Sequence, residues 1–369
     1  MRPTTKQLLL GILLIALAVR LPNIATHLPG TDEALTLNVA AGQPWGTASF
    51  EFFHPPLFFF IVQTVQLFPE PVLLLRLLMV AAGVATVLVT FFFGRDLAGS
   101  RLGLLAAFLV TINPMSVIYS QHGRPYILFS LLYLLSTWLL YRFLFKQDRR
   151  GLLALPGIYA LAFYNHYLSA LFIAAHVAVV AGLRLRRPIA WKPYVAVLLV
   201  TGLLVAPILL HFLTNVADLS QSPQTWMGSL TPLTFPYPVY KYAVMADIST
   251  VAAHYPPVAA LFPVSVALAA LGLWRLYRED RKKACYLAGV FLLVFVFSAI
   301  ASLYILIYFF RYLTYLLPVY LLLMAFGLEK QRPWLRAALL VAFIVGWAVV
   351  LQDYFTVSLL GDWAIDFAV

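Results

Sequence analysis

The sequence predicts an all-α polytopic membrane protein with about eleven transmembrane helices and one re-entrant or interfacial half-helix. Of its 369 residues, 63% are hydrophobic and only 11% are charged, and the mean hydropathy is +0.91. About a quarter of the residues in a soluble domain are charged, so this composition excludes a soluble enzyme. Apolar runs recur along almost the whole chain, and in lipid only helices or closed barrels pair every backbone group.

The predicted spans follow from the apolar runs in chain order. The first run follows Arg2 and Lys6 like a signal peptide, but no small-residue cleavage site follows it, so we interpret it as an uncleaved helix. The eleven spans are 7–19, 72–93, 102–119, 126–141, 152–164, 167–183, 194–212, 256–274, 284–310, 312–328 and 335–351. A further apolar piece, 55–68, opens with two prolines and is bounded by Glu51 and Glu70, which indicates a half-helix.

The distribution of charge supports this topology. The net charge of +11 comes from 25 basic and 14 acidic residues, and most of the basic residues lie in small clusters between apolar runs, where loop charge sets orientation. We therefore expect no nucleic-acid partner, a multi-pass protein of the plasma (inner) membrane, and a cytoplasmic N-terminus. Two long loops, 21–71 and 213–255, then lie outside the cell. We expect one transmembrane domain over 1–369 with no separate soluble domain.

The first outer loop carries two adjacent carboxylates, Asp32 and Glu33. They provide one candidate general base and one candidate orienting group or ligand for a divalent cation such as Mg²⁺ or Mn²⁺. Thr31 could cap a short helix that begins at Asp32 and favours both acids through its dipole. An ordinary solvated acid pair is the alternative interpretation.

Three cationic or titratable side chains are candidates for binding an anion at the same membrane surface. His54 precedes Pro55-Pro56 and so lies at the N-terminus of the predicted half-helix, a suitable position for gripping an anion. Arg124 and Arg311 each stand at an outer helix end, where two guanidiniums can clamp a phosphate. Snorkelling arginines that anchor helix ends are the alternative.

Four further residues could line the same pocket. His122 and Tyr126 flank Arg124, His166 lies in a tight outer turn, and Lys241 lies among aromatic residues of the second outer loop. For His166 the alternative interpretation is a histidine that stabilises the turn and has no role in a ligand site. The aromatic residues near Lys241 suit the interfacial belt, sugar stacking, or cover for a prenyl chain.

Together these residues resemble the GT-C superfamily of membrane glycosyltransferases, in particular the prokaryotic relatives of protein O-mannosyltransferases and of the lipid A aminoarabinose transferase. The resemblance covers roughly residues 20–328. It is carried by an Asp-Glu pair in the first outer loop, His-Pro-Pro-Leu, Leu-Leu-Arg76-Leu, Asn113-Pro114 before Ser-Gln-x-x-Arg124-Pro-Tyr126, Asn-His166-Tyr, and Phe-Arg311-Tyr-Leu-x-Tyr-Leu-Leu-Pro318.

The resemblance implies a polyprenyl-phosphate-sugar donor, an extracytoplasmic active site and inversion at the anomeric carbon. It makes Asp32 the base and Glu33 its partner, and it places His54, Arg124 and Arg311 at the donor phosphate. The acceptor would be a hydroxyl of a glycan, lipid or protein. Many relatives carry an acid where this chain has His122, which leaves metal dependence open.

The main rival hypothesis is a transporter or flippase of lipid-linked sugars, and a non-catalytic scaffold is a third. A transporter would need charges deep within the spans to gate alternating access. The predicted spans are nearly free of charge, and the titratable groups gather on one face. This asymmetry favours an enzyme with a fixed site.

Overall fold

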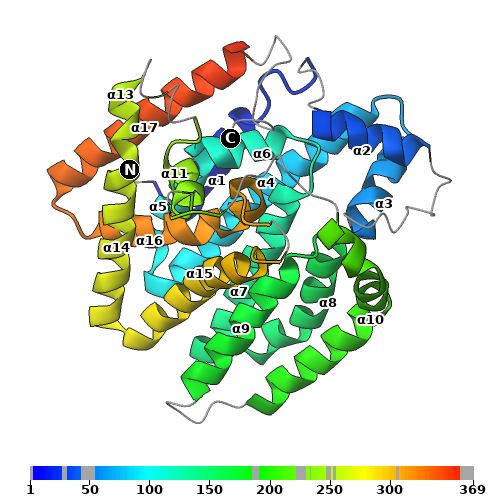
Figure 1. The fold of residues 1–369 in the computed structure, drawn as a ribbon. Helices are drawn as coiled ribbons and strands as arrows, with labels where there is room; N and C mark the ends of the chain where they lie inside the picture. Colours follow the sequence, from blue (N-terminus) through cyan, green and yellow to red (C-terminus); the bar gives the residue numbers. More distant parts are fainter. Residues whose placement is uncertain are drawn as a thin grey trace.

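The computed structural model describes residues 3–26, 31–42, 55–184, 191–221, 230–232, 234–246, 251, 255–304 and 307–357. All elements in these ranges are helical (Figure 1). They are α1 (Thr5–Ala18), α2 (Thr31–Ala41), α3 (Pro56–Val65), α4 (Pro71–Ala98), α5 (Ser100–Ile112), α6 (Pro114–Gln121), α7 (Tyr126–Lys146), α8 (Arg149–Asn165), α9 (Ser169–Arg184), α10 (Trp191–Gln221), α11 (Tyr237–Ala243), α13 (Pro256–Ala259), α14 (Leu261–Glu279), α15 (Arg281–Ala301), the 3₁₀-helix η2 (Phe310–Leu316), α16 (Leu317–Glu329) and α17 (Pro333–Val357).

The predicted all-α membrane fold is confirmed, and each of the eleven predicted spans contains a helix. Within the described ranges, seven helices are long and apolar enough to cross a membrane, or eight if the bent pair α5–α6 forms one span. Helix length alone does not give the predicted eleven spans, because α1, α8 and α9 have only 14, 17 and 16 residues. A straight crossing needs about 20 residues.

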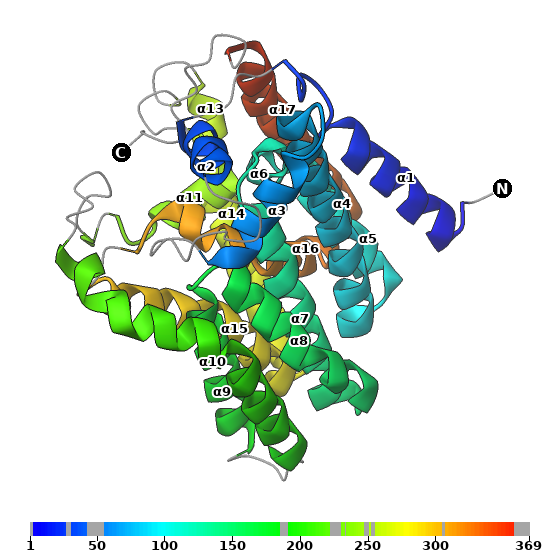
Figure 2. The same ribbon diagram turned by 90° about the vertical axis from the view of Figure 1, so that its right-hand side faces the viewer.

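The predicted half-helix is α3, whose ten residues are too few to span a bilayer. Pro55 caps it and Pro56 occupies its first position, where a missing N–H costs nothing. Phe58 and Val62 are buried in a small hydrophobic core together with Leu75 of α4. This core also holds α2, because α3 packs against both α2 and α4 (Figure 2).

The predicted span 102–119 is a bent pair, because the helix breaks between α5 and α6 with a bend of 59°. Asn113 is extended and its side chain accepts the N–H of Ser116, while Pro114 begins α6. Proline cannot donate the helical bond and disfavours a helical conformation in the residue before it. Apolar composition predicts burial here but not this change of direction, which aims the end of α6 at the region of Arg124.

Arg20 lies at the break and is fully buried. Its guanidinium donates to the carbonyls of Val110 and Thr111 at the end of α5, at 3.2 and 3.0 Å, and to Ser116 and Ser120 of α6, at 2.9 and 3.0 Å. The carbonyl oxygens at a helix C-terminus carry partial negative charge. They therefore stabilise this buried cation and tie α1 to both halves of the broken span.

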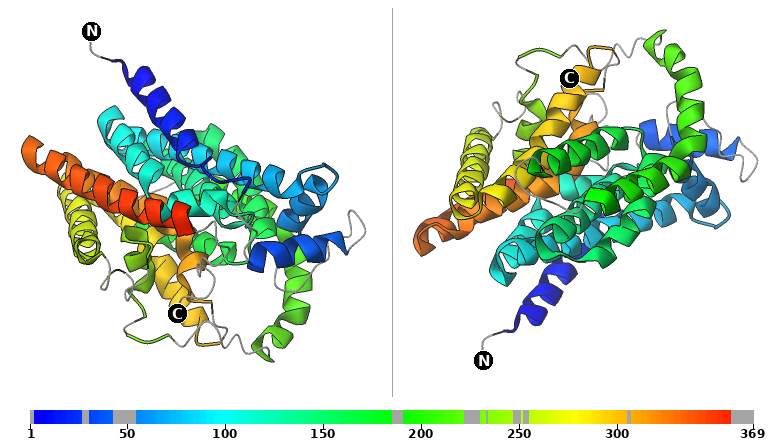
Figure 3. Two further views of the ribbon diagram at one scale, coloured as in Figure 1. Left: turned by 90° about the horizontal axis from the view of Figure 1, so that it is seen from above. Right: turned by 90° about the horizontal axis from the view of Figure 1, so that it is seen from below.

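The centre of the bundle is α16, in which every residue from Leu317 to Leu328 is buried. It crosses α14 so closely that a Cβ atom on Gly272 would overlap the carbonyl oxygen of Leu323, and one on Gly327 would overlap that of Leu268. Small residues allow such backbone approach in membrane bundles. Figure 3 shows α1 and α17 on the outside of the bundle.

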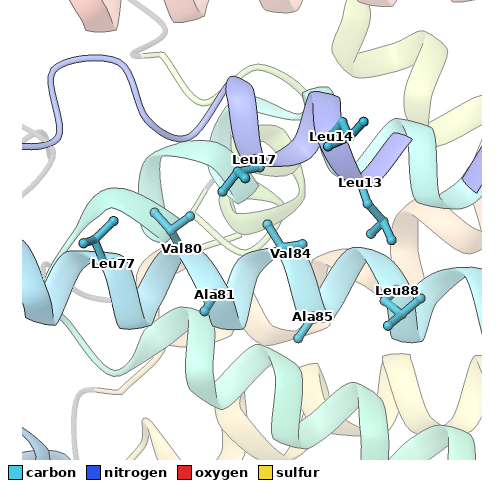
Figure 4. A pocket seen from close by; sticks show the side chains of 9 residues that line it. All are labelled: Leu13, Leu14, Leu17, Leu77, Val80, Ala81, Val84, Ala85 and Leu88. Atoms are coloured by element: carbon cyan, nitrogen blue, oxygen red, sulfur yellow. The ribbon is translucent and has the colours of Figure 1, made fainter. Parts of the chain in front are cut away.

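An apolar groove of about 500 Å³ lies between α1 and α4 (Figure 4). Its wall includes Leu13 and Leu17 of α1 and Val84 and Leu88 of α4. All nine lining side chains are leucine, valine or alanine, and none is a predicted site residue. The groove thus belongs to the apolar surface of the bundle rather than to the candidate site.

Candidate active site

Helix α2 carries both predicted acids in its first turn, where the helix dipole favours negative charge. Successive residues on a helix point about 100° apart, so Asp32 and Glu33 face different surroundings. The facing residues come from α4, the α6–α7 connection and η2. The two acids therefore have to be considered separately.

Glu33 forms a buried ion pair with Arg76 of α4. The Nε and Nη2 atoms of Arg76 donate to Oε1 and Oε2 of Glu33 at 2.9 and 2.7 Å, and the two side chains are 4% and 3% exposed. The backbone N–H of Gly123 also donates to Oε1 at 3.1 Å. A Cβ atom on Gly123 would lie 2.5 Å from that oxygen, so glycine allows this loop to close over Glu33.

Asp32 instead faces two arginines from distant parts of the chain. Nη1 of Arg311 donates to Oδ2 of Asp32 at 2.8 Å, and Nη2 of Arg124 lies 3.9 Å from the same oxygen. The Asp32 side chain is 27% exposed, whereas the arginines are 9% exposed or less. The fold thus brings three predicted site residues together and leaves the carboxylate as the accessible member.

Arg124 is also fixed to the backbone of α2. Its Nη1 atom donates to the carbonyl oxygen of Asp32 at 3.1 Å and to the hydroxyl of Thr36. Thr36 donates in turn to the same carbonyl at 2.8 Å. Thr36 was not among the predicted site residues, although its position one helical turn after Asp32 places it on the same face.

Aromatic rings surround the two arginines. The Arg124 guanidinium carbon lies 5.8 Å from the Tyr126 ring, and that of Arg311 lies 5.5 Å from the Tyr312 ring. The Tyr126 and Tyr312 rings are themselves 6.1 Å apart. A guanidinium over a π-face is stabilised by the ring quadrupole, so these rings hold both cations in a partly desolvated site.

The other predicted pocket residues lie at different places around this centre. His122 is partly buried, with its ring 6.0 Å from that of Tyr119. Lys241 of α11 is 3% exposed, and its ammonium lies 4.9 Å from the ring of Phe310, the neighbour of Arg311 in η2. His54 lies outside the described residues.

His166 packs against the aromatic rings beside the arginines. Its ring stacks on Phe129 at 5.0 Å and lies 5.8 Å from Tyr312, and its Nδ1 atom accepts the N–H of Leu168 at 3.3 Å. Burial and the positive charge of Arg124 lower the pKa of His166 to about 3. His166 is therefore neutral at physiological pH, with its proton on Nε2.

A depressed pKa predicts a specific loss of stability in acid. Between about pH 6.5 and pH 3 the unfolded chain binds a proton at His166 that the folded chain does not bind, so stability falls as the pH falls through this window. At pH 5 the effect is at most about 2 kcal/mol. We expect the melting temperature of His166→Gln in detergent to fall less between pH 7.5 and pH 5 than that of the wild type. An equal fall in both proteins would contradict the assignment.

Arg76 is the main site residue that the sequence analysis did not assign. It was visible as a lone cation within an apolar run, and such a cation is expected to find a buried partner. No spacing rule connects it to Glu33, 43 residues earlier. The pairing depends on the packing of α2 over α4.

The acids do not fit a cation shared between Asp32 and Glu33. Both oxygens of Glu33 accept hydrogen bonds from Arg76, and Oδ2 of Asp32 accepts one from Arg311. Three guanidiniums around two carboxylates also oppose a further positive charge. Among the described residues no group of three or more His, Cys, Asp or Glu side chains could hold a metal ion.

Comparison with known proteins places this geometry in a recognised fold. Residues 53–235 match the family model described as dolichyl-phosphate-mannose-protein mannosyltransferase. ArnT from Cupriavidus metallidurans in the apo state aligns with a TM-score of 0.65 and 16% identity, over 90% of this chain and 61% of that chain. This protein has the fold of a GT-C membrane glycosyltransferase. The predicted resemblance to that superfamily is confirmed.

Two further solved structures share the GT-C fold. ArnT from C. metallidurans bound to undecaprenyl phosphate has a TM-score of 0.61 and 17% identity, over 93% of this chain and 62% of that chain. AglB, an oligosaccharyltransferase from Archaeoglobus fulgidus in complex with an inhibitory peptide and a dolichol-phosphate, has a TM-score of 0.59 and 17% identity, over 95% and 56%. The chain thus spans about three fifths of the length of the ArnT structures. A search of curated proteins gave no significant match.

Proposed function

We propose that this protein is an integral-membrane glycosyltransferase that moves a sugar from a polyprenyl-phosphate-sugar donor to an acceptor hydroxyl. The observation that carries the proposal is the accessible Asp32 carboxylate held between the guanidiniums of Arg311 and Arg124 in a GT-C fold. The solved ArnT and AglB complexes contain undecaprenyl phosphate and dolichol-phosphate, which supports a donor of this class. Glycan, lipid and protein acceptors are all compatible with this site.

The proposed reaction is an inverting displacement at the anomeric carbon. The acceptor oxygen attacks C1 as its proton passes to Asp32, and the bond between C1 and the phosphate oxygen breaks with its electron pair on the phosphate. Arg311 and Arg124 stabilise the charge that develops on the departing prenyl phosphate. Glu33 does not touch the reacting atoms in this scheme. Its role is to position Gly123, next to Arg124, through the bond to Oε1.

The contact between Asp32 and Arg311 implies that binding of the donor phosphate also releases the Asp32 carboxylate. Oδ2 of Asp32 and a phosphate oxygen would compete for the same Arg311 donor, which now lies 2.8 Å from Oδ2. A bound phosphate would draw the guanidinium toward itself and free the carboxylate to accept the proton of the acceptor. This predicts that the donor binds before the acceptor is activated.

The orientation in the membrane is part of the proposal. The positive-inside bias places the N-terminus in the cytoplasm and the Asp32 site on the outer face of the plasma membrane. The structure describes a multi-pass helical protein that is compatible with this topology. The lipid of the donor would then lie among the helices with its sugar at the outer surface.

Sugar transfer from a panel of radiolabelled undecaprenyl-phosphate sugars, in membranes that contain the protein, tests this function. Glu70→Gln is the matched control for Asp32→Asn, because Glu70 is an exposed carboxylate at the start of α4. We expect transfer by the wild type and by Glu70→Gln. Movement of a lipid-linked sugar between leaflets without transfer would instead assign the protein to the transporters.

A further inference from the structure

A strongly basic surface lies where the α14–α15 and α16–α17 junctions meet, and we call residues 275–283 with 329–336 the junction surface. It lies at the opposite end of α16 from the Asp32 site. Helix α16 begins directly after η2, which contains Arg311, and its 13 residues end at Glu329, roughly 20 Å further along the axis. Figure 1 shows the α14–α15 junction at the lower left, away from α2 and α6.

The two junctions are held together by specific contacts. The close crossing at Gly272 and Gly327 brings α14 and α16 into backbone contact. Nη1 of Arg275 donates to the carbonyl oxygen of Gly327 at 2.9 Å, and Nζ of Lys330 pairs with Oε1 of Glu279 at 3.0 Å. Residues more than 40 positions apart in the sequence therefore form one surface.

This surface carries a large excess of positive charge. Its eight basic residues are Arg275, Arg278, Arg281, Lys282, Lys283, Lys330, Arg332 and Arg336, and its three acids are Glu279, Asp280 and Glu329. Two of the acids are already engaged, since Glu279 pairs with Lys330 and Asp280 caps α15 and lies 3.5 Å from Lys283. Most of the positive charge that these acids do not balance therefore lies on the arginines.

Three exposed guanidiniums remain available on the junction surface. Arg278, Arg281 and Arg332 are exposed and form no ion pair with any acid in the described part of the chain. The Arg281 guanidinium lies 5.2 Å from the ring of Tyr277, which holds it near the helix surface. Each guanidinium presents paired N–H groups that match the oxygens of a phosphate.

Two exposed tryptophans flank these guanidiniums. Trp274 of α14 is 57% exposed and Trp334 of α17 is 66% exposed. Indole rings prefer the level of the lipid headgroups. Trp274 precedes Arg278 by about one turn, and Trp334 follows Arg332 by two residues. The tryptophans therefore place the free guanidiniums at the depth of the lipid phosphates.

We propose that the junction surface binds the headgroups of anionic phospholipids in the membrane leaflet opposite the Asp32 site. The guanidiniums of Arg278, Arg281 and Arg332 bind the phosphates, while Trp274 and Trp334 lie among the headgroups beside them. Basic pockets between membrane helices recognise anionic lipids by this chemistry. The proposal rests on charge and exposure at this surface and does not depend on the proposed sugar transfer.

Thermal unfolding of the purified full chain in a neutral detergent tests this proposal. The protein is compared with added phosphatidylglycerol, phosphatidylcholine or glycerol 3-phosphate. We expect phosphatidylglycerol alone to raise the melting temperature, and R278Q/R281Q/R332Q to lose most of that rise. The matched control R101Q/R149Q/R150Q removes the same charge from exposed arginines at other helix starts and should keep the rise.

Three outcomes would overturn the proposal. The first is a wild type that phosphatidylglycerol stabilises no more than phosphatidylcholine. The second is an equal loss of the rise in both triple variants, which would mean that diffuse positive charge is sufficient. The third is an equal rise with glycerol 3-phosphate, which would assign the surface to a soluble anion.

Discussion

Asp32→Asn is expected to lower sugar transfer by about 10²- to 10⁴-fold, the range for losing a general base, while the protein still folds and binds polyprenyl phosphate. Asparagine has nearly the same shape as aspartate but cannot accept the proton of the acceptor hydroxyl. The variant also removes the carboxylate that competes for Arg311 at 2.8 Å. We therefore expect undecaprenyl phosphate without a sugar to bind the variant more tightly than the wild type.

Binding of sugar-free undecaprenyl phosphate and transfer of a radiolabelled sugar have to be measured on the same preparations. Glu70→Gln controls for the loss of one negative charge at a position without a side-chain capping bond. Full transfer by Asp32→Asn would remove Asp32 from the role of base. Weaker binding by Asp32→Asn than by the wild type would contradict the competition for Arg311. A wild type that binds no undecaprenyl phosphate would contradict the proposed donor class.

Glu33→Gln is expected to prevent stable folding rather than to slow the chemistry. It leaves the guanidinium of Arg76, which is 4% exposed, without its counter-ion. Removing one partner of a buried ion pair costs about 3–5 kcal/mol, which is a large part of the total stability of a protein. Arg76→Gln should cause a similar loss, because it leaves the Glu33 carboxylate uncompensated.

A double variant distinguishes loss of the pair from loss of a catalytic group. Replacing a buried pair by apolar residues of similar volume is often neutral or stabilising, so Glu33→Leu with Arg76→Met should recover more folded protein than either single glutamine variant. Yield of monodisperse protein and melting temperature in detergent measure this recovery. A well-folded but inactive Glu33→Gln would contradict the structural role and return Glu33 to the reacting groups.

The adjacency of Asp32 and Glu33 in the sequence suggested a shared role, and the structure separates them. The sequence identifies both acids as candidates, because two adjacent carboxylates just outside the membrane offer a general base and an orienting group. It could not assign their partners, because neighbouring residues on a helix point about 100° apart and the residues they face come from α4, the α6–α7 connection and η2. Asp32 faces Arg311, whereas Glu33 faces Arg76.

Arg20 and Pro114 illustrate the limit of hydrophobicity as a guide. The apolar run 102–119 predicted a span without showing how sharply it bends, and no pattern in the sequence indicated a partner for Arg20, which follows the first apolar run. The structure breaks the span at Pro114 and buries Arg20 against the carbonyls that the break exposes. A window average records how apolar a segment is, but it does not record where freed backbone groups find a partner.

Composition and loop charge are properties of single residues, and they were enough to predict a membrane protein built from helices and to select Asp32, Arg124 and Arg311 as candidates. The pairing of each acid with its cation depends on the packing of the helices, which holds α2 through Glu33 and leaves Asp32 accessible. These pairings join residues as much as 279 positions apart. They depend on the close packing of helices, which no local pattern of residues encodes.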